Sequence, residues 1–99
     1  MQKFIDRTLY AESGGPIGEV RDVIRRPQDL EPEWLVVKTN RIRGEHLVPI
    51  SAVVEKHQSL TVPFDKETVK ASPVVKEHIA PPTSERVATY RHYGLLAPE

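Results

Sequence analysis

The sequence predicts a mainly β fold, a small antiparallel barrel or sandwich of about six short strands with a short C-terminal helix. Two observations carry this prediction. Nine prolines and five glycines interrupt the 99-residue chain at short intervals. The runs between them are rich in valine, isoleucine, leucine and threonine, which favour extended backbone. Short β-favouring runs separated by turn residues are typical of small all-β domains.

Composition narrows the class of protein. Hydrophobic residues make up 38% and charged residues 28%, an ordinary balance for one globular domain. Lys+Arg and Asp+Glu are equal at 14 each, which argues against a uniformly basic nucleic-acid binder. The absence of cysteine excludes disulfides, thiol catalysis and cysteine-ligated metal sites. No apolar run reaches the roughly 18 residues of a membrane span, and the first residues lack the apolar core of a secretory signal. We therefore expect a soluble cytoplasmic protein.

The first two strands are predicted over residues 4–12 and 17–25. Between them, Ser13-Gly14-Gly15-Pro16 is a turn signal, because glycine adopts positive φ without steric cost. The more apolar face of the second strand is expected to point into the core. That face consists of Gly18, Val20, Asp22 and Ile24.

The third strand, residues 34–39, follows a polar loop with two prolines. It is a continuous apolar run, which predicts either burial on both faces or a strand that lies under a covering segment. A hairpin loop over residues 40–44 leads to a fourth strand, residues 45–50. Pro49 near its end predicts an edge position or a bulge. The fifth and sixth strands are predicted over residues 53–57 and 59–64.

The last third of the chain is predicted to be partly helical. Asp65 begins one or two helical turns over residues 65–71, and Ser72-Pro73 ends them. The tail over residues 72–82 reads as polar and adds little core. A second helix is predicted over residues 84–93, capped by Thr83 or Ser84, with Val87 and Tyr90 on one face. Gly94 followed by Leu95 indicates a helix stop.

Several runs, in order, resemble the PRC-barrel domain family. They are Gly15-Pro16-Ile17-Gly18-Glu19-Val20-Arg21-Asp22-Val23, Trp34-Leu35-Val36-Val37 and Leu47-Val48-Pro49-Ile50. Residues 62–73 and 90–95 are similar to small stand-alone bacterial members. The resemblance covers residues 4 to 96 and implies a small, mostly antiparallel PRC-type β-barrel over residues 1–73. Residues 74–99 are then an extension that packs on the barrel or on a partner. The positions we assign to the structural motif are Gly15, Gly18, Asp22, Pro49, Pro73 and Gly94.

The resemblance also implies a function. The PRC-barrel domain forms the cytoplasmic part of the photosynthetic reaction-centre H subunit and the C-terminal domain of a ribosome maturation factor. In both settings it is a protein-docking module without an enzymatic residue set, and some stand-alone members are associated with stress response. We therefore expect a non-enzymatic protein-binding or scaffold module. The alternatives are an RNA- or ribosome-associated factor and a small-ligand binder or enzyme.

The residues give no catalytic or cofactor motif of their own. No nucleophile elbow is present, and the glycine-rich stretch at residues 14–18 lacks the Walker spacing. The four histidines have no helical ligand spacing, so a metal site would need carboxylates such as Glu45 or Glu55. The alternative is that the histidines lie on the surface and titrate near neutral pH. We expect no enzyme activity, no cofactor and no metal.

Two features are candidates for partner binding, and Asp22 has separate structural and chemical interpretations. Arg41 and Arg43 share a tight loop that either binds RNA or an acidic protein surface, or is simply solvated. Trp34 is either a core residue or an interface anchor. Asp22 is either a structural carboxylate that accepts backbone N–H groups or a perturbed acid. The full set of candidate partner-binding residues is Trp34, Arg41, Ile42, Arg43, Tyr90, Tyr93 and Leu95.

A homodimer is also expected. A barrel of few short strands buries a small fraction of its surface, and association compensates for this. Tyr90 and Tyr93 in the last helix are expected to pack it on the barrel or on a second copy of the chain.

Overall fold

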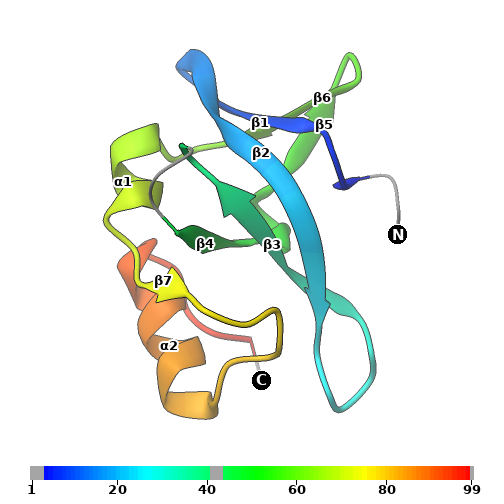
Figure 1. Ribbon diagram of the computed structural model, residues 1–99, viewed down its shortest axis with the longest axis vertical. Coiled ribbons are helices and arrows are strands. Elements are labelled where there is room, and N and C mark those ends of the chain that lie inside the picture. Colours follow the sequence, from blue (N-terminus) through cyan, green and yellow to red (C-terminus); the bar gives the residue numbers. More distant parts are fainter. Residues whose placement is uncertain (1–3, 41–43, 99) are drawn as a thin grey trace.

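Residues 4–40 and 44–98 are described by the computed structural model, and they form one seven-stranded mixed sheet with two short α-helices (Figure 1). The strands are β1 (Thr8–Ala11), β2 (Gly14–Arg25), β3 (Pro32–Lys38), β4 (Glu45–Pro49), β5 (Val54–Lys56), β6 (Ser59–Val62) and β7 (Val74–Val75). The helices are α1 (Lys66–Lys70), α2 (Thr83–His92) and the 3-10 turn η2 (Ile50–Ala52).

The strand order in the sheet is β5-β6-β1-β2-β3-β4-β7. This confirms a mainly β fold, but the prediction of a small antiparallel barrel of about six short strands is met only in part, and the structure differs from it in three respects. β1 and β6 pair in parallel, with Leu9 opposite Leu60. A seventh strand, β7, adds to β4. Among the described residues the sheet stays open, with β5 and β7 at its edges. The cause is the path of the chain after β4, which brings β6 alongside β1 in the same direction.

β3 lies inside the sheet between β2 and β4 and is buried on both faces, as predicted. Residues 34–37 are all fully buried. Their side chains alternate between two clusters, because successive residues of a strand point to opposite faces. Leu35 and Val37 lie in the first cluster, and Trp34 and Val36 lie in the second.

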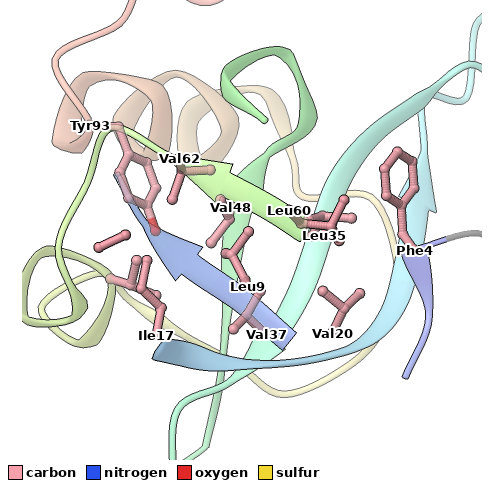
Figure 2. Packing of buried hydrophobic residues seen from close by; sticks show 12 residues of the cluster. Phe4, Leu9, Ile17, Val20, Leu35, Val37, Val48, Leu60, Val62 and Tyr93 are labelled. Carbon is pink, nitrogen blue, oxygen red and sulfur yellow. The ribbon is translucent and has the colours of Figure 1, made fainter. Parts of the chain in front are cut away.

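The first cluster fills the concave side of the curved sheet. Figure 2 shows Leu9, Val20 and Val48 from three different strands pointing toward one another, with Tyr93 closing one end. The Tyr93 hydroxyl donates a hydrogen bond of 2.6 Å to the carbonyl of Leu47, and burial raises the pKa of that phenol to about 12. The end of α2 is therefore tied directly to β4.

The second cluster lies on the other face of β3, under α2. Trp34 packs against Tyr90 of α2, with ring centroids 4.6 Å apart. Val75 and Ala80 also pack against this cluster, and Ser72 is buried. These contacts are only partial, and no hydrophobic residue of the segment over residues 72–82 is fully buried. The expectation that this segment adds little core is therefore confirmed.

A bulge in β2 changes the position of Asp22. The β2–β3 register shifts between Val20 and Asp22, so that Val20 lies opposite Val37 and Asp22 opposite Val36. A bulge breaks the alternation of faces along a strand. The Asp22 side chain is consequently 39% exposed, and the prediction that it faces the core is wrong. Its Oδ1 accepts a hydrogen bond of 2.8 Å from the backbone N–H of Val23.

The helix ends follow local chemistry, with one exception. Asp65 caps α1, accepting from the Thr68 N–H at 2.8 Å, as predicted. The stop after α2 is also confirmed: Gly94 has φ +75°, and the Leu95 N–H donates to the Tyr90 carbonyl at 2.9 Å. The predicted side-chain cap of α2 by Thr83 or Ser84 is wrong, because Pro82 occupies the N-cap position and makes no side-chain cap bond.

The other motif positions also have defined places. Gly15 has φ +63° in the turn that starts β2. Pro49 ends β4 opposite Trp34, beyond the two residues of β4 that pair with β7, so it takes the edge position predicted for it. Pro73 follows α1 and leads into β7.

Gly18 generates the first prediction, because a Cβ at this position would collide with the carbonyl oxygen of Lys38 on β3. The substitution Gly18→Ala should lower the free energy of unfolding by about 1 to 3 kcal/mol, since the clash is with backbone and the central pair of strands must separate. Urea denaturation measures this. Glu19→Ala, one residue along in an exposed ion pair with Arg21, is the control and should change stability by less than about 0.5 kcal/mol. Equal losses in the two variants would contradict this account.

Candidate docking groove

A groove of about 380 Å³ lies between β7, the segment over residues 76–82, and α2. In Figure 1 this segment leaves β7, runs across toward β2 and turns back to the start of α2. The lining residues are Leu47, Pro73, Val74, Val75, Lys76, Glu77, Ile79, Ala80, Pro81, Pro82, Glu85 and Thr89. The volume falls within the range of ordinary binding pockets.

β7 gives the groove an edge strand. Its two residues pair with β4, Val74 opposite His46 and Val75 opposite Glu45. Antiparallel pairs alternate between those that exchange backbone hydrogen bonds and those that do not. One of the two residues therefore directs its N–H and C=O away from β4, on the open edge of the sheet.

Apolar side chains are exposed along the same groove. Val74 is 53% exposed and Ile79 is 63% exposed, although both are large aliphatic residues. Pro73, Pro81 and Pro82 are further wall residues, and their fixed φ makes those walls stiff. An apolar concave surface with stiff walls needs little reordering before a ligand binds.

Three charged side chains also line the groove. They are Lys76, Glu77 and Glu85, so the lining is acidic by one charge. Glu85 lies in the first turn of α2. A ligand that carries one basic residue beside apolar ones would match this lining in charge.

A buried ionic network holds α2, one wall of the groove, on the sheet. Glu33 of β3 is buried, and its Oε2 accepts from Arg86 Nε at 2.9 Å, from Arg86 Nη2 at 2.7 Å and from the Tyr90 hydroxyl at 2.8 Å. The Glu33 carboxylate raises the pKa of Arg86, while burial raises the pKa of Tyr90. Arg86 Nη2 also donates to the carbonyl of Pro98 at 2.9 Å, which ties down the C-terminal tail.

Two histidines hold the chain on either side of β7. His46 is buried, and its Nδ1 lies 3.0 Å from the carbonyl of Ser72; desolvation lowers its pKa. The alternative that all four histidines lie on the surface is thus wrong for His46. His78 bridges two carboxylates, with Nδ1 2.8 Å from Asp22 Oδ2 and Nε2 2.7 Å from Glu45 Oε1. In the part of the chain that the structure describes, no three histidine, aspartate or glutamate side chains are placed to hold a metal ion.

The sequence-predicted partner residues do not form one surface. Trp34 and Tyr90 are buried between β3 and α2 of the same chain, and Tyr93 is buried at one end of the first cluster. Leu95 is half-buried and packs against both clusters. The predicted loop residues Arg41, Ile42 and Arg43 lie outside the described residues. The groove residues of β7 and of the segment over residues 76–82 were missed. Their only signal in the sequence is a pair of valines followed by an isoleucine and two prolines.

Comparison with known proteins identified no relative of this chain. No protein-family model matches the sequence, and no curated protein matches it. Within residues 4–40 and 44–98, no helix is long and apolar enough to cross a bilayer. What the protein does is therefore inferred from the groove.

The Glu33 network generates the second prediction. Tyr90→Phe removes one of the donors to a buried carboxylate and should lower the free energy of unfolding by about 1 to 3 kcal/mol. Tyr10→Phe is a matched control, because the Tyr10 side chain is 37% exposed on β1, and it should change stability by less than about 0.5 kcal/mol. Thermal and urea unfolding measure both variants. A Tyr90→Phe protein as stable as the Tyr10→Phe protein would show that the network does not hold α2 in place.

Proposed function

We propose that the protein is a non-enzymatic binding module of the PRC-barrel type, and that it docks an extended segment of a protein partner in the groove between β7 and α2. The observation that carries this proposal is the exposure of Val74 on the edge strand β7 and of Ile79 in the adjoining wall of the groove. Side chains of this kind gain about 1.5 to 3 kcal/mol each on full burial. A covering partner supplies that burial.

The shape of the groove favours an extended peptide over other ligands. A peptide that adds to a sheet edge satisfies outward-facing backbone groups, while pockets beside the edge bind alternate side chains. The groove offers both features, since β7 supplies the edge and the segment over residues 76–82 supplies apolar walls. The acidic balance of the lining favours a segment with apolar residues and at least one lysine or arginine.

Val74 and Val54 provide the third prediction. They lie on opposite edge strands of the same sheet and have nearly equal exposure, 53% and 50%. A random-peptide library selected on the wild-type protein should yield extended apolar peptides with a basic residue. Val74→Thr should weaken binding of the selected peptide about tenfold, because a buried hydroxyl without a partner costs about 1 to 3 kcal/mol. Val54→Thr, with the same change of side chain, should leave the affinity unchanged.

Several results would contradict the docking proposal. One is a library that yields no specific peptide, and another is a peptide whose affinity falls equally in both valine variants. Purification of the tagged protein from its own cells, with and without nuclease, adds a further test. Recovery of ribosomal proteins that disappear on nuclease treatment would favour the RNA-associated alternative.

Self-association is part of the proposal as well. The domain is small, and Val54, Val74, Ile79 and Leu96 all remain exposed in a single copy. Light scattering at micromolar concentration should give about twice the 11.2 kDa mass of one chain. A mass near that of one chain would exclude the homodimer and leave the peptide-docking proposal in place.

A further inference from the structure

His78 connects the groove wall to two separate strands. It lies in the segment over residues 76–82, and its ring bridges Asp22 on the β2 bulge and Glu45 at the start of β4. The two contacts, 2.8 Å and 2.7 Å, involve the two ring nitrogens separately. Its sequence neighbours Glu77 and Ile79 both line the groove. The position of this wall therefore depends on the bridge.

The two acceptors define the protonation state of the ring. Carboxylate oxygens accept hydrogen bonds and do not donate them, so each ring nitrogen must carry a proton to complete both bonds. Only the imidazolium form satisfies this condition. Removing one proton leaves a nitrogen lone pair directed at a carboxylate oxygen, and one of the two bonds is replaced by repulsion.

We propose that His78 is a protonation-controlled latch that holds the segment over residues 76–82 against β2 and β4 and so sets the shape of the groove. The effect of the latch on ligand binding rests on the proposed function, because the site that it would regulate is the docking groove. The latch itself is a property of the free protein and does not require a ligand.

The charged surroundings of His78 favour its protonated form. Asp22 faces it from β2 and Glu45 faces it from β4. Lys38 of β3 stands opposite Glu45 in the register, and Lys76 and Glu77 precede His78 in its own segment. The hydrogen bond to Glu45 raises the pKa of His78; partial burial opposes this, and the bond to Asp22 adds to it.

The direction of the pH effect follows from this shift. The folded pKa lies above the ordinary value of 6.5, so the stabilisation by the bridge is fully present below 6.5. It is lost as the pH rises through the raised pKa. The latch is therefore closed below pH 6.5 and opens as the pH rises through the raised pKa of His78. Opening loosens a preorganised wall, which weakens peptide binding.

Nuclear magnetic resonance on the free, full-length protein tests the latch. The His78 ring should titrate above pH 6.5, and the backbone order parameters of residues 77–80 should fall from about 0.85 toward about 0.6 as the pH passes that midpoint. In His78→Gln the segment should be mobile at both pH 6 and pH 8. His57→Gln is the control, because His57 lies on an exposed turn, and it should behave as the wild type. Asp22→Asn and Glu45→Gln should each lower the His78 midpoint.

Two results would overturn the latch: a His78 midpoint at or below 6.5, or order parameters of residues 77–80 that do not change through the midpoint. The groove is tested separately with the selected peptide. Its affinity should fall about two- to tenfold as the pH rises through the His78 midpoint in wild type, which corresponds to the loss of one hydrogen bond, and should not change with pH in His78→Gln. If the His78 titration changes the order parameters as expected but the protein binds no peptide, the docking proposal is refuted and the latch proposal stands.

Discussion

The structure depends on one strand that is buried on both faces. β3 contributes Leu35 and Val37 to the cluster inside the curved sheet, and Trp34 and Val36 to the cluster under α2. Other elements must pack on both faces of such a strand, because an uncovered face would leave large aliphatic or aromatic side chains in water. The remaining strands cover the first face. The C-terminal third of the chain covers the second, and the groove forms where that cover meets the edge strand β7.

The contacts between α2 and β3 explain how a short polar helix is held in one position on the sheet. Apolar contact alone is modest, since Tyr90 and a few small residues supply most of it. The helix is fixed in direction by Glu33, whose buried carboxylate accepts from both Arg86 and Tyr90. Burying this charge is costly unless its partners stay in position. The same requirement that holds α2 on β3 thus fixes the wall of the groove that α2 provides.

The sequence was sufficient to predict features that depend on near neighbours. The buried run at residues 34–37, the Asp65 cap and the Gly94 stop all follow from residues a few positions apart. The parallel partner of β1 and the two-residue strand β7 depend on how distant segments meet, which no local pattern encodes. The bulge before Asp22 belongs to the same group. One extra residue turned a predicted core position outward and brought Asp22 within reach of His78. The groove was missed for this reason, because its walls come from segments that read as an irregular polar tail.

Contacts between the protein and a bound peptide give the most direct test of the docking account. Intermolecular nuclear Overhauser effects, measured on the complex with a library-selected peptide, report which side chains lie against it. The account predicts contacts from the peptide to the methyl groups of Val74 and Ile79, with the peptide extended beside β7. Contacts confined to the opposite edge of the sheet at β5 would contradict it. So would contacts confined to the surface of α2 that faces away from β7.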